Sequence, residues 1–344
     1  MADALILGGT GVIGRAIAAH LAAASWRVKV AGRNPANMPA ELRTAGVDFI
    51  AADRADAARL RAAIGDGVDL LVDCVCYTAT TAHSLVELAA DAGSTVLMSS
   101  KAVYIDAAGN HANSQVEPRF DGPINESAPT LTANDIDYRS HAGYGPNKVA
   151  AEQVSLDSGQ PISILRPSRV HGIGGSRPRE WVFVKRILDR RTTVLLARRG
   201  TGVVHTTAAA NIAALVETVA HTPGARILNI ADPDSPSALD ISRTIANHLD
   251  HQWKEVLLDD QTDDRLGATP WDSAHPVVLD TSAAAALGYR PTGDYATTVA
   301  AQIDWLLDAA ETGDRSGILP AADDPYFGHF FDYATEDRFL ARVC

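Results

Sequence analysis

ALILGGTGVIG, residues 4–14, is the stretch that decides the fold. Its first four residues are apolar and predict a buried strand. Apolar residues then recur at helical spacing, at Ile13, Ile17 and Leu21, and predict a helix over residues 13–24. A strand, a tight turn and a helix therefore follow one another directly.

The glycines of this turn have separate roles. Gly8 permits the tight turn, Gly11 lets a ligand approach the backbone, and Gly14 lets the helix pack closely on the strand. Amide groups at the helix N-terminus attract phosphate. The stretch thus predicts a pyrophosphate-binding turn for a dinucleotide, with contacts from Gly8, Thr10, Gly11, Val12, Ile13 and Gly14.

Strand and helix patterns go on alternating through the first 100 residues. The sequence predicts strands at 28–31, 49–51, 70–75 and 95–98, separated by helices at about 38–45, 55–64 and 82–92. This alternation predicts an α/β fold, a Rossmann doubly wound parallel sheet with helices on both faces. Ligands of such sheets bind at the carboxyl ends of the strands.

The remainder of the chain divides by composition. Residues 105–143 are rich in Gly, Asn, Asp, Pro and Ser and predict a long loop over an active site. A helix from about Tyr144 and a strand at 162–165 complete a dinucleotide-binding domain over 1–176. Looser patterns over 177–322 predict a smaller α/β substrate-binding lobe, and the aromatic residues of 323–344 predict a docked C-terminal segment.

Composition excludes several classes of protein. The formal net charge of −12 disfavours nucleic acid as a partner. We find neither a signal peptide nor an apolar stretch long enough to span a membrane. Three cysteines, Cys74, Cys76 and Cys344, are too few for a disulfide scaffold. A cytoplasmic protein with a small-molecule substrate fits best.

Cys74, Val75 and Cys76 end an apolar run. Alternation predicts that both cysteines lie on the same face of a strand, where small residues line the wall of the cofactor site. Without further cysteines or histidines nearby they make a poor metal site, and no metal is expected.

Two residues at the end of the second strand favour one cofactor. NAD enzymes place an acid there, whereas this chain has Arg33 and Asn34. An arginine forms charge-assisted bonds to a 2′-phosphate, so NADP is favoured, with NAD as the alternative. Asp53, at the end of the third strand, and Arg54 are candidate contacts of the adenine.

Tyr144 and Lys148 are the candidate acid/base pair. Their i, i+4 spacing places both side chains on one face of a helix. A phenol is a poor base at neutral pH unless a nearby cation stabilises its ionised form, which the lysine can do. Ser100 ends the strand at 95–98 and can bond the same substrate oxygen, so we expect Ser100, Tyr144 and Lys148 to be catalytic.

The combined pattern resembles the NAD-dependent epimerase/dehydratase family of the extended short-chain dehydrogenase/reductase superfamily. The matching segments are 8–14, Asp53, 99–104, 123–126, Tyr144–Lys148 with Glu152, 165–167 and 287–291. The resemblance implies the Ser-Tyr-Lys triad, and it implies that Ser99, Pro167, Ser168 and Val170 contact the cofactor near the nicotinamide. Candidate substrate-binding residues are Lys101, Tyr104, His141, Arg169 and Arg177.

The chain departs from the family pattern at three places. Lys101-Ala102 replaces the Asp-Glu pair of sugar-nucleotide dehydratases. Val204, Ala208 and Asn211 replace the arginine, histidine and aspartate of epimerases similar to UDP-galactose 4-epimerase, although Arg169, Arg177 or Arg199 could substitute for that anchor. The short region over 74–95 resembles the reductase-like branch that includes isoflavone-reductase-like and chloroplast RNA-binding members.

Three functions follow from this pattern. The first is an NADP(H)-dependent oxidoreductase that interconverts a ketone and a secondary alcohol on a polar, sugar-like metabolite. The second is a sugar or sugar-nucleotide epimerase that retains its cofactor. The third is a non-catalytic nucleotide-binding or RNA-associated protein, which the triad and the negative charge disfavour. His171 and His205 are expected to be packed or solvated, and a homodimer is an open possibility.

Overall fold

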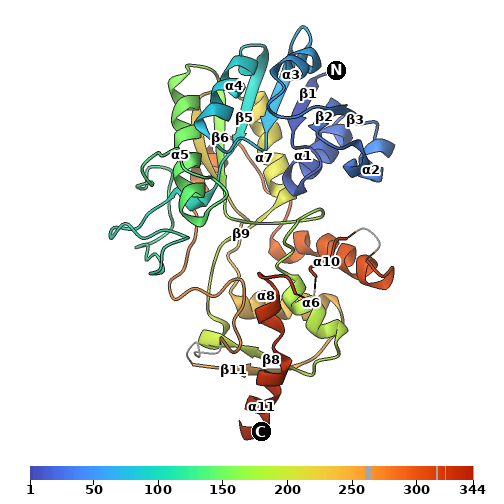
Figure 1. Cartoon of the computed structure of the whole chain (residues 1–344), viewed down its shortest axis with the longest axis vertical. Helices are drawn as coiled ribbons and strands as arrows, with labels where there is room; N and C mark the ends of the chain where they lie inside the picture. The colour runs from blue at the N-terminus through green and yellow to red at the C-terminus, as the bar shows by residue number, and fades with distance from the viewer. Residues whose placement is uncertain (260–264, 315–316, 322, 344) are drawn as a thin grey trace.

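The computed structural model describes residues 1–259, 265–314, 317–321 and 323–343. Figure 1 shows two bodies: a sheet with helices on both sides, and a smaller lobe that carries the C-terminal end. Cys344 lies outside the described residues. In the described part of the chain, no helix has both the length and the apolar character needed to cross a membrane.

The larger body is built on a seven-stranded sheet in the order β10-β6-β5-β4-β1-β2-β3, and every pairing is parallel. The predicted doubly wound sheet is therefore confirmed. Its order changes direction between β1 and β4, where such sheets bind their ligands. The strands are β1 (Asp3–Leu7), β2 (Arg27–Gly32), β3 (Asp48–Ala51), β4 (Val68–Asp73), β5 (Ala92–Met98), β6 (Ile162–Pro167) and β10 (Arg226–Ile230).

Each face of this sheet is covered by a helical layer with its own apolar core. One layer contains α1 (Val12–Ala23), α2 (Ala40–Thr44) and α7 (Ala209–His221). The other contains α3 (Ala57–Ile64), α4 (Ala79–Ala89) and α5 (His141–Asp157). Leu5 and Leu7 face one layer while Ala4 and Ile6 face the other, as alternation along a strand requires.

The smaller lobe has a separate core around Phe183 and the buried, stacked ring of Trp271. β8 (Thr193–Leu196) and β11 (Lys254–Leu257) form a two-stranded parallel sheet in it. The helices are α6 (Trp181–Leu188), α8 (Ala238–His248), α10 (Tyr295–Glu311) and α11 (Tyr333–Val343), together with the short η3 (Ala197–Gly200) and η4 (Gly328–Phe331). α9 (Ser282–Ala286) instead packs near β10.

The predicted division at residue 176 needs a correction. α7 packs against α1, and β10 pairs with β6, so both belong to the larger body although they lie within 177–322. A short parallel pair lies where the chain passes from one body to the other. It consists of β7 (Arg169–His171) and β9 (Thr206–Ala208). Periodicity within one segment does not say which sheet a strand joins.

The C-terminal segment is docked on the smaller lobe. Arg186 of α6 forms a buried ion pair with Glu336 of α11 at 2.6 Å. Arg191 pairs with Asp337 at 2.5 Å, and the side chains of Phe327 and Phe330 are buried. Phe327 and Phe330 thus belong to the lobe's core, with Tyr326 and Phe331 packed against it.

One strand end and one helix start differ from the predicted positions, and a local hydrogen bond explains each. β4 ends at Asp73 instead of residue 75, because the Asp73 carboxylate accepts a hydrogen bond from the Val75 amide at 2.9 Å and turns the chain. α5 begins at His141 instead of near Tyr144, because the Ser140 hydroxyl caps the helix by accepting from the Gly143 amide.

Candidate active site

The glycine turn between β1 and α1 has the geometry that a pyrophosphate needs. Gly8 has a φ of +78°, a backbone conformation that residues with a Cβ rarely adopt. A Cβ added to Gly14 would lie 2.5 Å from the Gly8 carbonyl oxygen, so only glycine lets α1 start this close to the turn. A Cβ at Gly11 would meet nothing nearer than 3.6 Å, which leaves its side open to a ligand. A dinucleotide fits this cradle.

The end of β2 presents Arg33 to solvent. Its side chain is exposed and, within the described ranges, has no ion-pair partner. The neighbouring Asn34 side chain accepts a hydrogen bond from the Ala36 amide and caps η1 (Pro35–Asn37). Arg33 is thus available to a ligand, whereas Asn34 also has a structural role.

Asp53 and Arg54 lie at the end of β3. Asp53 is exposed and accepts from the Ala55 amide at 2.9 Å. Arg54 forms an ion pair with the buried Asp73 at 2.7 Å and donates to the Thr81 carbonyl, which ties β3 to β4 and α4. Their contact with an adenine stays a prediction, and the structural role of Arg54 is one that the sequence did not indicate.

Cys74, Val75 and Cys76 are at the carboxyl end of β4, but the prediction that both cysteines share one strand face is wrong. β4 ends at Asp73, so the cysteines lie in the turn that leads to α4. Burial raises the pKa of the Cys76 thiol to about 12 and also raises that of Cys74, so both are neutral, unreactive side chains.

Lys148 is fixed at the centre of the candidate site. It is buried, and its ammonium donates to the carbonyl oxygens of Cys76 and Met98, each at 2.8 Å. It also lies 5.9 Å from the centre of the Tyr144 ring. The lysine therefore joins the ends of β4 and β5 to the helix that carries the tyrosine.

Glycine lets that helix approach Ser100. A Cβ at Gly145 would lie 2.9 Å from the Ala102 carbonyl oxygen and 2.4 Å from the Leu131 side chain. Ala102 belongs to η2 (Lys101–Val103), which Ser100 caps by accepting from the Ala102 amide at 3.1 Å. The start of α5 thus lies directly against the turn that carries Ser100.

Ser99 differs from its prediction. Its hydroxyl donates to Glu152 at 2.5 Å, and Glu152 forms a buried ion pair with Arg166 at 2.5 Å. The proton of the Ser99 hydroxyl is thus already used, and its contact with a cofactor stays a prediction. The Ser99–Glu152–Arg166 chain instead holds the end of β5 against α5 and β6, and thereby fixes the position of Ser100.

Tyr104 was predicted to bind substrate, and that prediction is wrong. The side chain is only 1% exposed, and its hydroxyl donates to Asn229 at 2.7 Å. The Arg166 guanidinium lies over its ring at 4.8 Å. Tyr104 is a core residue because its polar end and its ring both have partners inside the protein.

Two tyrosines that the sequence analysis did not select lie beside the candidate site. The Tyr77 ring stacks on Tyr138 at 5.2 Å, lies 6.4 Å from Tyr144 and has the Lys148 ammonium 4.4 Å from its centre. Burial, followed by the Tyr144 charge, raises the pKa of Tyr77 to about 12, so this phenol stays neutral. The only sequence signal is its place directly after Cys76.

Both histidines near the junction of the bodies are packed. His171 contacts Asp232 at 2.9 Å, and His205 contacts the backbone carbonyl of Asp232 while accepting from the Leu279 amide. Burial lowers the pKa of His205. His141 is exposed at the start of α5. The residues predicted to lie near the nicotinamide are at the end of β6 or just after it. Pro167 ends the strand and is buried, as is Ser168, and Val170 follows.

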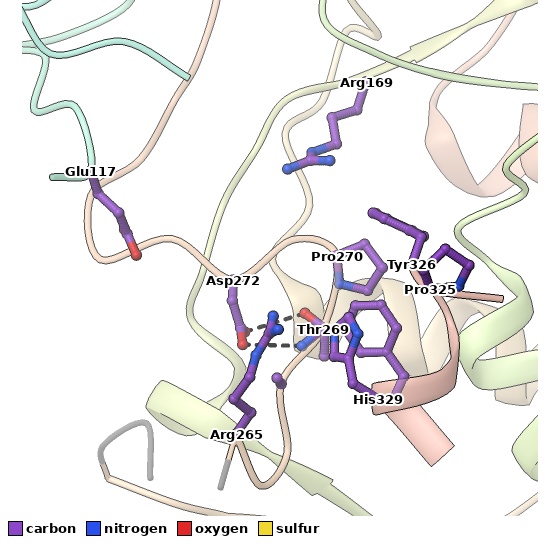
Figure 2. Close-up of a pocket in the computed structure, with 11 residues that line it drawn as sticks. Glu117, Arg169, Arg265, Thr269, Pro270, Asp272, Pro325, Tyr326 and His329 are labelled. Atoms are coloured by element: carbon purple, nitrogen blue, oxygen red, sulfur yellow. Dashed lines mark hydrogen bonds between the residues drawn. The ribbon is translucent and has the colours of Figure 1, made fainter. Parts of the chain in front are cut away.

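A cavity of about 660 Å³ lies between the loop at Glu117, the smaller lobe and the C-terminal segment, with Arg169 on its wall. Figure 2 shows the Arg169 guanidinium directed into it, with Glu117, Asp272 and Tyr326 around the same space. Burial raises the pKa of Asp272 to about 6. Arg177 is exposed, and its guanidinium lies 5.5 Å from the centre of the Tyr326 ring. Two predicted substrate residues, Arg169 and Arg177, thus meet at Tyr326.

Comparison with known proteins agrees with this fold. Residues 4–143 match a family model described as the saccharopine dehydrogenase NADP binding domain. No protein with a curated description matches the sequence.

Three solved structures align over most of the chain. A candidate epimerase from Burkholderia cenocepacia has a TM-score of 0.70 at 19% identity, covering 90% of this chain and 99% of its own. A UDP-glucose 4-epimerase from Stenotrophomonas maltophila with bound NAD has 0.68 at 19%, covering 91% and 100%. A dTDP-glucose 4,6-dehydratase from Bacillus anthracis in complex with NAD has 0.67 at 14%, covering 90% and 98%. The chain therefore has the fold of the NAD-dependent epimerases and dehydratases, with a match to an NADP-binding domain in its first part.

Proposed function

We propose that the chain is an enzyme of the extended short-chain dehydrogenase type, an NADP(H)-dependent oxidoreductase that interconverts a ketone and a secondary alcohol on a polar, sugar-like metabolite. The observation that carries the proposal is the buried Lys148, held beside Tyr144 by the carbonyl of Met98 at the end of β5 and that of Cys76 in the turn after β4. It lies at the carboxyl edge of the sheet, on the same side as the glycine turn. The fold shared with NAD-dependent epimerases and dehydratases supports it.

The proposed chemistry divides between cofactor and protein. When bound, the nicotinamide supplies or accepts the hydride. The Tyr144 hydroxyl gives a proton to a substrate carbonyl oxygen or takes one from an alcohol. The positive charge of Lys148 stabilises the phenolate that remains, and Ser100 donates a hydrogen bond to the same substrate oxygen.

An epimerase with retained cofactor is the second candidate, because the similar UDP-glucose 4-epimerase structure carries bound NAD. The two functions differ in cofactor exchange. We expect protein purified without added dinucleotide to bind NADPH reversibly and to release NADP after each turnover. A dinucleotide that stays bound through purification, with turnover that needs no added cofactor, would favour the epimerase.

Arg33 is expected to set the cofactor preference. One salt bridge to a 2′-phosphate contributes about 1.5–3 kcal/mol, so NADP should bind about one to two decades more tightly than NAD. Calorimetric titration of both dinucleotides measures this, with Arg33→Ala as the test and Arg61→Ala as the control, since Arg61 is an exposed arginine paired with Glu87. Equal affinities in the wild type, or a preference that survives Arg33→Ala, would show that Arg33 takes no part.

Nucleotide sugars are expected to bind poorly. Val204 and Ala208, at the positions of the charged anchors in sugar-nucleotide enzymes, are only 4% and 2% exposed and therefore offer no contact to a diphosphate. Arg199 forms a surface ion pair with Asp259. A thermal-shift and turnover screen with NADP(H) present should show little response to UDP- or dTDP-sugars and a clear response to smaller ketones or alcohols. Turnover of a nucleotide sugar at micromolar concentration would contradict this prediction and favour the epimerase over the reductase.

A further inference from the structure

Three cations lie together beside Ser100. Lys101 follows Ser100 directly, and Arg169 begins β7. Arg179 donates at 3.5 Å to the carbonyl of Val170, the residue after Arg169. Burial, and then the positive charges of Arg169 and Arg179, lower the pKa of Lys101 to about 7. Burial and Arg179 likewise lower the pKa of Arg169 to about 10. The three side chains therefore repel one another.

No acid compensates this repulsion among the residues that the structure describes. Lys101, Arg169 and Arg179 form no ion pair there, and Tyr326 is the only neighbour that stabilises the charged form of Arg169. The buried Nε atoms of Arg169 and of Arg179 also have no hydrogen-bond partner. The three side chains are partly buried, and charge withdrawn from water without a partner is unfavourable. The arrangement therefore favours a ligand that supplies the missing negative charge.

The acids that line the cavity, Glu117 and Asp272, are engaged elsewhere, and so is Glu180, which lies outside its lining. Glu117 pairs with Arg198 and accepts from the Ala274 amide at 2.5 Å. Asp272 accepts from the Thr269 amide and hydroxyl, as Figure 2 shows. Glu180, beside Arg179 in the chain, accepts from Gln302 at 2.7 Å. Arg169 nevertheless opens into a cavity of about 660 Å³ that admits a small molecule.

We propose that Lys101, Arg169 and Arg179 form a binding site for the phosphate group of a phosphomonoester substrate, and that the phosphate lies close to the carbon that reacts. The second half of the statement rests on the proposed function, because Ser100 and Tyr144 define the reacting carbon. Two guanidinium groups and an ammonium match the several oxygens and the double charge of a phosphate. The cavity beyond Arg169 holds the remainder of the substrate.

The first test uses inorganic phosphate as the probe on the full chain. We expect calorimetry to show binding that weakens by about 10- to 100-fold in Arg169→Gln and in Lys101→Met, as for loss of a charge-assisted contact. Arg61→Gln, at an exposed arginine on α3, is the matched control and should bind phosphate as the wild type does. Equal binding in all four proteins would overturn the proposal.

A second readout separates ligand binding from a structural role. If the cluster exists for a ligand, removing one cation relieves repulsion, so the melting temperature of Lys101→Met without phosphate should not fall below that of the wild type. Its rise on addition of phosphate should be smaller. A variant that melts lower and keeps the full phosphate response would show a structural lysine and overturn the assignment.

The third test identifies the source of the phosphate. A hexose 6-phosphate, the free hexose and a UDP-hexose are compared by calorimetry in the wild type and in Arg169→Gln. We expect the hexose phosphate to bind most tightly and to lose most in the variant. Tighter binding of the UDP-hexose would overturn the phosphomonoester. These measurements depend on binding and not on turnover. Tyr144→Phe should therefore still bind phosphate, even if the proposed catalytic role of Tyr144 is wrong.

Discussion

Replacing Tyr144 with phenylalanine is expected to lower turnover by about two to four orders of magnitude, the range for loss of a general acid/base. The ring and its place beside Lys148 and Tyr77 remain, so only the proton-carrying hydroxyl is removed. Folding and dinucleotide binding should stay close to those of the wild type. Steady-state kinetics on a verified substrate, with calorimetric titration of NADPH, measure both.

Tyr333→Phe is the matched control for this change. It also removes one phenol oxygen, but from α11, where the hydroxyl donates to Asp189 at 2.6 Å and lies far from the glycine turn. Its turnover should equal that of the wild type. Activity of Tyr144→Phe within about threefold of the wild type would rule out the role of Tyr144, since general acid/base catalysis contributes far more.

Replacing Arg166 with methionine is expected to destabilise the protein by about 3–5 kcal/mol, because it leaves a buried charge without its partner. The Arg166 and Glu152 side chains are each 3% exposed and lie 2.5 Å apart. Burial opposes the charge of Arg166, but the hydrogen bonds and the charge of Glu152 outweigh it and raise the pKa of Arg166, so the guanidinium is charged. Only the Ser99 hydroxyl would remain to bond the Glu152 carboxylate. Unfolding in urea, followed by circular dichroism, measures the change.

A surface pair provides the comparison. Arg243 contacts Glu255 at 2.7 Å, yet its side chain is 52% exposed, so Arg243→Met should lower the urea midpoint much less than Arg166→Met does. The double variant Arg166→Met with Glu152→Gln should recover part of the loss, since no buried charge remains. Similar losses for Arg166→Met and Arg243→Met would mean that the buried pair contributes no more than the exposed one.

The parts of the molecule that the sequence predicted are those set by local chemistry. The order of strands and helices through residue 100 follows from short-range periodicity, and the Gly8–Gly14 turn from backbone conformation at single glycines. The spacing of Tyr144 and Lys148 places them on one helix face whatever surrounds them. Each of these predictions depends on residues within a few positions of one another.

The residues whose roles the sequence misassigned or missed depend on partners far along the chain. Tyr104 is buried because Asn229, 125 positions later, accepts its hydroxyl. Tyr77 reaches the candidate site through stacking on Tyr138, and Arg179 matters only because the fold returns it to Lys101. No periodicity within a single segment carries such information. The missed residues are therefore those that connect separate elements.

The pairing of β10 with β6 has a consequence for how the protein is made. During synthesis the sheet stays incomplete until residue 230 has left the ribosome, and by then α6 and β8 of the smaller lobe have already been produced. Until that moment the edge of β6 is without its partner strand, and α7, with Ile212, Leu215 and Val216, can only pack on an incomplete sheet. A fragment cut at residue 176 would keep this exposed edge permanently. The larger body therefore cannot complete its sheet before part of the smaller lobe has been synthesised, although the two bodies are separate in the folded structure.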